Sequence, residues 1–215
     1  MVILDNVLNE SLLTSIRERV ESESLPWYFI ENSAYPENRE LVKNTPLNYS
    51  FYHYVLRPNF TSTSFNKEVL SPLNDITNSI SLILKDLFNV ERAYSVFRLR
   101  WGLTTSVDRP HRHTPHTDLD LAGELFSPTQ ADIPIPHKVI LFYLNDSDGD
   151  TYFYDKEHNI INSITPRTNR AVLFDGNTLH SSSKPIRFSR RIALNINLVD
   201  EEKLKILMKE ANEKN

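Results

Sequence analysis

Helical hydrophobic patterns dominate parts of the first ninety residues. Apolar side chains at three- and four-residue spacing predict a helix over about 9–22, with Asn9 or Ser11 as its cap. A second amphipathic helix is predicted over 68–88, with one face buried in the core. The apolar positions of that face are Leu73, Ile76, Ile80, Leu84 and Leu87.

Short extended patterns make up most of the remaining chain. Two aromatic-rich runs, 26–35 and 48–56, are typical of strands. From residue 93 onward, six or seven short runs are bounded by turn residues. We therefore predict a mainly β, α+β fold: an antiparallel jelly roll whose outer face is covered by helices. The runs lie at 93–101, 109–120, 138–145, 151–155, 158–165, 170–176 and 190–199.

Length and composition predict one globular domain. The chain has 215 residues, of which 40% are hydrophobic, and no linker or internal repeat divides it. We expect a single domain over 1–215, in which about 1–90 supports a β core of about 91–200. Residues 201–215 are predicted to form a C-terminal helix, interpreted as a solvated amphipathic end.

Charge and cysteine content narrow the possible functions. The net charge of −4 provides no general attraction to nucleic acids or anionic membranes. The N-terminus lacks a basic start followed by an apolar run, so we expect a cytoplasmic protein without a membrane span. The chain contains no cysteine, which excludes disulfides and thiolate ligands. Any metal must therefore bind to His, Asp or Glu.

The stretch RPHRHTPHTDLD, residues 109–120, contains candidate metal ligands. In an extended segment, residues two apart share a face, so His116 and Asp118 can reach one metal ion. His180 follows an apolar strand and a turn, and it is the candidate third ligand. Two histidines and one carboxylate make the facial triad, which leaves three iron(II) positions open. On this interpretation, His111 and His113 are rim residues.

The last predicted strand carries a candidate anion-binding residue. Alternation places Arg191 with Ala193, Asn195 and Asn197 on one face of the strand, and the apolar residues on the other. The apolar face is expected to pack under the helices. Arg191 then points into the roll, where its guanidinium could bind a carboxylate in two parallel hydrogen bonds.

Four segments together resemble the 2-oxoglutarate and iron(II)-dependent oxygenases, nearest the prolyl 4-hydroxylase type. They are HTD (His116 to Asp118), KVILFYLNDSDGDTYFY (138–154), NRAVLFDGNTLH (169–180) and RRIAL (190–194). The resemblance covers roughly residues 90–200 and depends on the order and spacing of these segments. It implies a double-stranded β-helix, a cupin-like jelly roll, which agrees with the strand pattern.

The resemblance also implies residue roles and a reaction. His116, Asp118 and His180 would bind Fe(2+), and Arg191 would bind the far carboxylate of 2-oxoglutarate. Tyr143 matches a position that shares this carboxylate, and Thr151 matches one that lines the same pocket. The implied reaction uses O2, with ascorbate as a reductant, and yields a hydroxylated substrate, succinate and CO2. We expect a small-molecule or peptidyl substrate.

Two further features bear on the choice of substrate. Arg98, Arg100 and Arg112 are candidate rim residues, and our hypothesis is that they attract a negatively charged substrate or its flank. Residues 121–137 form a long proline-bearing connection directly after the first two candidate ligands, which favours a lid or a binding loop.

Two other functions remain open at this point. A nucleic-acid demethylase on the same fold would need a second arginine after Arg191, where this chain has Asn195 and Asn197. A non-catalytic cupin-like module that binds a metal or 2-oxoglutarate is the other alternative. Binding of 2-oxoglutarate without its decarboxylation would distinguish that module from an enzyme.

Overall fold

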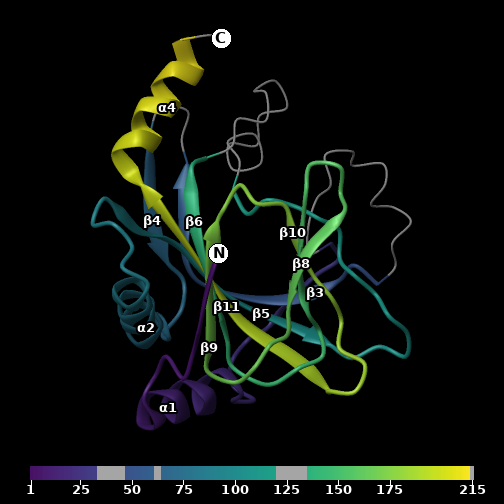
Figure 1. The fold of residues 1–215 in the computed structure, drawn as a ribbon. Coiled ribbons are helices and arrows are strands. Elements are labelled where there is room, and N and C mark those ends of the chain that lie inside the picture. The colour runs from purple at the N-terminus through teal and green to yellow at the C-terminus, as the bar shows by residue number, and fades with distance from the viewer. Residues whose placement is uncertain (33–46, 61–63, 120–134, 214–215) are drawn as a thin grey trace.

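The structure is a computed structural model that describes residues 1–32, 47–60, 64–119 and 135–213 (Figure 1). Its helices are α1 (Glu10–Val20), α2 (Asn74–Leu87) and α4 (Glu201–Glu213). Its strands are β1 (Val2–Asp5), β2 (Tyr28–Ile30), β3 (Ser50–Phe60), β4 (Phe65–Val69), β5 (Tyr94–Thr105), β6 (His137–Tyr143), β7 (Thr151–Tyr154), β8 (Ile160–Ile164), β9 (Arg170–Asp175), β10 (His180–Ser182) and β11 (Arg190–Asp200).

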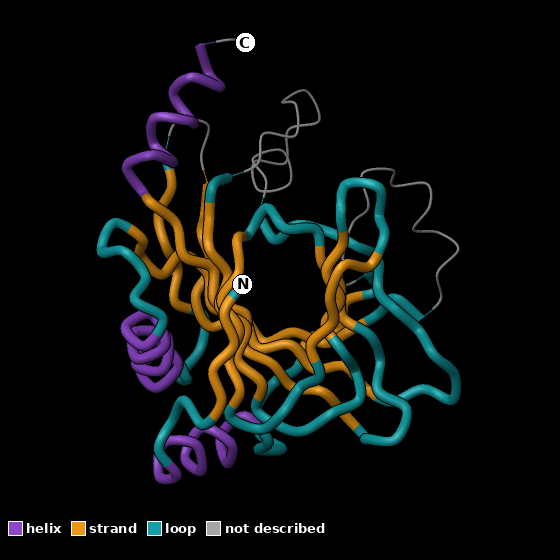
Figure 2. The backbone as a smooth tube through the Cα atoms, in the orientation of Figure 1, coloured by secondary structure: helices purple, strands orange, loops and turns teal. Residues whose placement is uncertain are grey.

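The strands form two antiparallel sheets, which confirms the predicted mainly β jelly roll. The larger sheet has the order β1-β9-β6-β11-β5-β3-β2, with β4 paired to β3, and the smaller has the order β10-β7-β8. Figure 2 shows the smaller sheet opposite part of the larger one. Strands β1 to β4 belong to the larger sheet. The first ninety residues therefore build the sheet as well as supporting it.

The outer face of the larger sheet is covered by helices, as the alternation in β11 predicts. The apolar residues of β11 and the apolar faces of α1 and α2 lie in one buried cluster. In α1, Asn9 caps the first turn by accepting a hydrogen bond from the Leu12 amide. Each fully buried aliphatic side chain contributes roughly 1.5–3 kcal/mol, so this cluster is a main source of stability. Members of the cluster include Leu13, Ile16, Val20, Ile80, Leu84, Ile192, Leu194, Ile196 and Leu198.

The second helix differs from its prediction at both ends. Residues 68–69 belong to β4, and α2 begins only at Asn74. Pro72 explains the late start, because proline disfavours helical geometry in the residue before it and lacks a backbone donor. Leu87, predicted to be buried, is 45% exposed. The buried stripe of α2 is completed by the small polar residues Thr77 and Ser81 instead.

The histidine-rich stretch is not a regular strand, although it was predicted as one of the extended runs. Two isolated antiparallel bridges attach it to the edge of the smaller sheet, Arg112 to Ser183 and His116 to His180. In the second bridge, the amide of each histidine donates to the carbonyl of the other, at 2.9 and 3.0 Å. This bridge places two of the candidate ligands side by side.

The C-terminal helix is anchored rather than wholly solvated, contrary to our interpretation. Leu204 and Met208 of α4 are 1% and 2% exposed, and they pack in a cluster with Phe97, Leu119 and Val199. Helical spacing of four residues places both side chains on one face. No helix in the described part of the chain is long and apolar enough to cross a membrane.

Candidate metal centre and pocket

A pocket lies between the two sheets, on the face of the larger sheet opposite the helices. Strands β3, β5, β6 and β11 of the larger sheet contribute to it, and β7 and β10 contribute from the smaller sheet. Its polar lining includes Tyr52, Arg100, His116, Thr151, His180, Arg191 and Asn195. Two of the three predicted metal ligands and the predicted anion-binding residue thus line one pocket.

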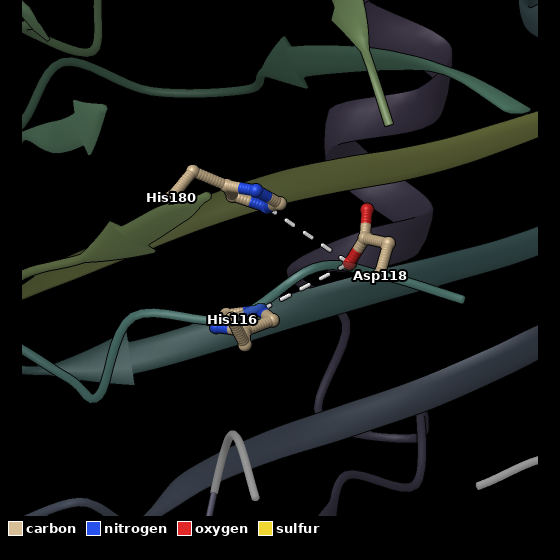
Figure 3. Close-up of side chains that lie close together, drawn as sticks. All are labelled: His116, Asp118 and His180. Carbon is tan, nitrogen blue, oxygen red and sulfur yellow. Dashed lines mark ion pairs between the residues drawn. The ribbon is translucent and has the colours of Figure 1, made fainter. Parts of the chain in front are cut away.

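His116, Asp118 and His180 offer three ligand atoms that all lie within 4.8 Å of one another. The Oδ1 atom of Asp118 is 3.9 Å from Nε2 of His116 and 4.0 Å from Nε2 of His180 (Figure 3). Figure 3 shows both imidazoles directed toward the carboxylate. Within the described ranges, this is the one group of His, Asp and Glu residues with metal-site geometry.

Backbone carbonyls orient both imidazoles. Nδ1 of His116 lies 3.1 Å from the Thr114 carbonyl oxygen, and Nδ1 of His180 lies 2.9 Å from that of Thr178. A carbonyl accepts only, so Nδ1 carries the proton in the neutral ring and the Nε2 lone pair faces Asp118. Such hydrogen bonds fix the tautomer and the direction of histidines that bind metals.

Asp118 is held so that one oxygen faces the histidines. Its Oδ2 atom accepts hydrogen bonds from the side-chain amides of Asn195 at 2.8 Å and Asn197 at 3.0 Å. The Arg98 guanidinium donates to the Asp118 carbonyl oxygen at 2.8 Å and lies 3.5 Å from Oδ1. Because Oδ2 is engaged, Oδ1 is the atom presented to a metal. The sequence places Asn195 and Asn197 on the Arg191 face of the strand, but it gives no sign that they bind the Asp118 carboxylate.

The protonation states suit a metal site. Burial alone would raise the pKa of Asp118, but His180, Arg98, Arg100 and His116 hold it well below its usual range. Burial, together with the neighbouring His180, lowers the pKa of His116 to about 4. Near neutral pH the aspartate is therefore ionised and His116 is neutral. These are the forms in which the two side chains coordinate a metal.

The three predicted rim arginines have different positions. Arg98 is buried beneath Asp118, where its Nε also donates to Asn197 Oδ1 at 2.8 Å, so the prediction of a rim position is wrong for this residue. Arg112 is exposed, and its guanidinium carbon lies 5.4 Å from the centre of the Tyr152 ring. Among the three, Arg100 lines the pocket. Arg98 is buried because it pairs with Asp118, whose carboxylate is itself buried.

Arg191 points into the pocket, as the alternation of β11 predicts. It is 6% exposed, and its Nη2 atom donates to Thr151 Oγ1 at 2.9 Å. The same hydroxyl lies 2.8 Å from the Tyr143 hydroxyl, and the guanidinium carbon lies 5.4 Å from the Tyr143 ring centre. By contrast, Arg190 is exposed and donates to Glu21 at 2.9 Å. The structure thus brings Arg191, Thr151 and Tyr143 together.

Two basic residues near the pocket are buried. His113 was expected at the rim, and Lys184 was not predicted to be buried. His113 is 2% exposed rather than at the rim, with Nδ1 2.9 Å from Ser182 Oγ. Lys184 is 2% exposed, and its ammonium lies 3.4 Å from the centre of the Tyr49 ring. Burial lowers the pKa of Lys184 to about 8. In the sequence, this lysine follows three serines and nothing marks it as buried.

The predicted lid lies mostly outside the described residues. Of the connection 121–137, positions 121–134 are not described. Ile135 and His137, which end it, are buried. Its role in substrate selection stays a prediction.

Structural similarity to solved proteins defines the class of fold. No model of a known protein family matches this sequence, and no curated protein matches it. A 2OG-Fe(II) oxygenase family protein from Burkholderia pseudomallei is similar with a TM-score of 0.63 at 14% identity, over 93% of this chain and 84% of that one. The chain therefore has the double-stranded β-helix fold of these oxygenases, and the expected fold is confirmed.

Two further structures share the fold and were solved with ligands. A prolyl hydroxylase from Trichoplax adhaerens, in complex with a hypoxia inducible factor peptide, has a TM-score of 0.57 at 14% identity, covering 94% of this chain and 84% of its own. HygX from Streptomyces hygroscopicus, with nickel, 2-oxoglutarate and hygromycin B bound, has a TM-score of 0.53 at 12% identity, covering 92% and 82%. The fold thus accommodates both a peptide and a small-molecule ligand.

Proposed function

We propose that this protein is an iron(II)- and 2-oxoglutarate-dependent dioxygenase. It hydroxylates a small-molecule or peptidyl substrate, consuming O2 and 2-oxoglutarate and releasing succinate and CO2. One observation carries the proposal: a single pocket combines the His116, Asp118 and His180 group with the buried guanidinium of Arg191. A facial triad and a fixed cation are what a metal-chelating diacid requires.

The strand register separates the two ends of the pocket along β11. Asn195 contacts Asp118 at the metal end, and Arg191 lies four residues away, about 13 Å along a strand. Between them, Ala193 pairs with Gly102 of β5, and both residues line the pocket. The side chain of Ala193 is a single methyl group, which leaves room between the two ends for the carbon chain of 2-oxoglutarate.

At the metal end, the residues would hold iron(II) through His116 Nε2, Asp118 Oδ1 and His180 Nε2. When bound, iron(II) supplies oxygen activation coupled to the oxidative decarboxylation of 2-oxoglutarate, with ascorbate as a reductant that keeps it ferrous. Asn195, Asn197 and Arg98 fix the direction of Asp118. The backbone carbonyls fix the two imidazoles.

At the other end, Arg191 would bind the far carboxylate of 2-oxoglutarate. Its Nη2 atom is placed by Thr151, and Thr151 is placed by the Tyr143 hydroxyl. Burial raises the pKa of Tyr143, so its hydroxyl stays protonated and can donate to a carboxylate. A guanidinium that is nearly excluded from water makes stronger hydrogen bonds to a carboxylate than an exposed one does.

The proposal is tested by binding and turnover of 2-oxoglutarate. Purified protein with iron(II), ascorbate and 2-oxoglutarate is expected to form succinate, even slowly without substrate, and to show a visible metal-to-ligand charge-transfer band without air. His116→Ala is expected to remove both signals. His158→Ala, at an exposed histidine in the turn before β8, is the matched control and is expected to leave both unchanged.

Each contrary outcome has a definite meaning. No charge-transfer band and no succinate, with iron binding unaffected by His116→Ala, would overturn the proposal. Binding of 2-oxoglutarate with the band intact but no decarboxylation under any condition would favour the non-catalytic cupin-like module. A nucleic-acid demethylase has no support from the described residues, in which Asn195 and Asn197 are occupied with Asp118.

A further inference from the structure

Arg100 is a cation in the pocket without a carboxylate partner. Its side chain projects from β5 on the same face as Gly102 and Thr104, and all three line the pocket. In the part of the chain that the structure describes, no carboxylate oxygen lies within 4.0 Å of its guanidinium nitrogens. A partly buried guanidinium usually pairs with an anion, because removal from water is otherwise unfavourable.

Two tyrosines of β3 restrain this guanidinium. Its central carbon lies 4.0 Å from the ring centre of Tyr52 and 5.9 Å from that of Tyr54. The ring of Tyr52 lies over Gly102, so that a Cβ atom added at this glycine would lie 3.5 Å from the ring. The stacking faces leave the edges of the guanidinium, which carry its N–H groups, available for a ligand. Arg100 is therefore held in place before a ligand binds.

The cross-strand neighbour of Arg100 has an amide oxygen without a donor. Asn195 is its direct neighbour across β5 and β11 and also lines the pocket. The Nδ2 atom of Asn195 is used by Asp118, which also establishes the orientation of the amide. Its Oδ1 atom is buried and has no hydrogen-bond partner among the described residues. The pocket lining thus includes the N–H donors of Arg100 and the unpaired acceptor Oδ1 of Asn195.

2-Oxoglutarate does not match this pair of groups. The ionised keto diacid has only acceptor oxygens, so it cannot donate a hydrogen bond to Asn195 Oδ1. Its far carboxylate is already assigned to Arg191 in the proposed function. The matching ligand carries a negative charge and, next to it, an N–H or O–H group.

We propose that Arg100 binds a carboxylate of the substrate, while Asn195 Oδ1 accepts a hydrogen bond from an amine or hydroxyl group beside that carboxylate. The substrate class is then a small amino acid or hydroxy acid with a free carboxylate. This proposal rests on the proposed function. Arg100 is a binding residue in it, because its guanidinium contacts the substrate directly.

The test compares free acids with their carboxamides. Zinc(II)-loaded protein saturated with 2-oxoglutarate, which cannot turn over, is titrated with the twenty protein L-amino acids, the matching 2-hydroxy acids and the carboxamide of each. Saturation-transfer NMR measures the binding. At least one free acid is expected to bind about tenfold or more tightly than its carboxamide, since a charge-assisted hydrogen bond contributes that much.

Variants assign the preference to Arg100. Arg100→Gln is expected to bring the ratio of acid to carboxamide affinity close to one, and Arg100→Lys to retain part of it. Arg112→Gln removes an exposed cation outside the pocket lining and is expected to leave the ratio unchanged. The affinity for 2-oxoglutarate is measured on the same samples. It is expected to stay within about threefold in Arg100→Gln, which also shows that the variant is folded.

Three results would overturn the inference. They are equal binding of acids and carboxamides, no binding of any free acid while 2-oxoglutarate binds, and a loss of 2-oxoglutarate affinity in Arg100→Gln as large as in Arg191→Gln. The last result would assign Arg100 to the cosubstrate. Failure of the wild-type protein to bind 2-oxoglutarate, with a preference for acids that depends on Arg100, would count against the proposed function alone.

Discussion

The two ends of the pocket differ in how completely the protein satisfies its own polar groups. At the metal end, the Asp118 carboxylate has two amide donors and a nearby guanidinium. At the other end, within the described residues, Arg191 Nε is buried without a hydrogen-bond partner. The same is true of Nζ of Lys184, which lies two residues along the chain from the pocket-lining Ser182. The fold thus satisfies the carboxylate that would bind a metal, while Asn195 Oδ1 beside it has no donor. It leaves Arg191 Nε unmatched where we propose that an anion binds.

The largest effect is expected for Asp118→Ala, at the satisfied end. Iron binding should be lost, and the free energy of unfolding of the metal-free protein should fall by about 3 kcal/mol, because Arg98 and two amides lose their buried acceptor. Iron content and urea unfolding measure the two effects. Glu157→Ala, at an exposed carboxylate, is the control. Full iron binding by Asp118→Ala would show that this end does not serve a metal.

Next in size is Arg191→Gln, at the unsatisfied end. We expect the dissociation constant of 2-oxoglutarate to rise about 100-fold, because loss of a buried charged partner costs roughly 2–5 kcal/mol. Arg190→Gln removes the adjacent but exposed arginine, whose pair with Glu21 is worth less than about 1 kcal/mol, and should leave the constant unchanged. Equal effects of the two substitutions would remove the contrast between the ends. Titration of the metal-loaded protein without air provides both constants.

Lys184→Met tests whether an unmatched donor lowers stability. The pKa of Lys184 is lowered to about 8 from 10.5, so the unfolded chain binds more protons between these pH values. Wild-type stability should therefore rise as the pH increases from about 8 to 10.5. Below this range, the full free-energy cost of burying the charged ammonium group is present. The methionine variant should be more stable by about 2 kcal/mol at pH 7 and lose this pH dependence. Urea unfolding at pH 7, 8.5 and 10 measures it.

Lys209 provides the control for the test of Lys184. Lys209→Met replaces an exposed lysine of α4 and should retain the wild-type dependence on pH. A less stable Lys184→Met protein at pH 7 would mean that the contact with the Tyr49 ring outweighs the burial of the ammonium group.

The smallest effect is expected for Tyr143→Phe. Removing this hydroxyl breaks its bond to Thr151, and a net loss of about 1 kcal/mol corresponds to a roughly fivefold weaker binding of 2-oxoglutarate. Tyr152→Phe, at the residue that follows Thr151 in β7 of the smaller sheet, is the control and should bind normally. An effect as large as that of Arg191→Gln would mean that the phenol, rather than the guanidinium, is the main carboxylate contact.

Patterns of local origin were predicted well from the sequence. Alternation in β11 separates its apolar residues, which join the helix-covered core, from Arg191, which points into the pocket. The three candidate ligands were found from the spacing of His116 and Asp118 and from the setting of His180. Local rules failed where they compete, as at the start of α2, where helical periodicity continued through residues that Pro72 excludes from the helix.

The sequence by itself determined which side chains share a face, because that depends on the two-residue period of one strand. Only the tertiary structure decided which of them are partners. Asp118 meets Asn195 and Asn197 across 77 and 79 positions of the chain, and Arg98 meets Asn197 across 99. These contacts arise from the register of β5, β6 and β11 and from the docking of the histidine stretch onto β10. The free energy of pairing buried polar groups therefore depends on strand neighbours that no local pattern specifies.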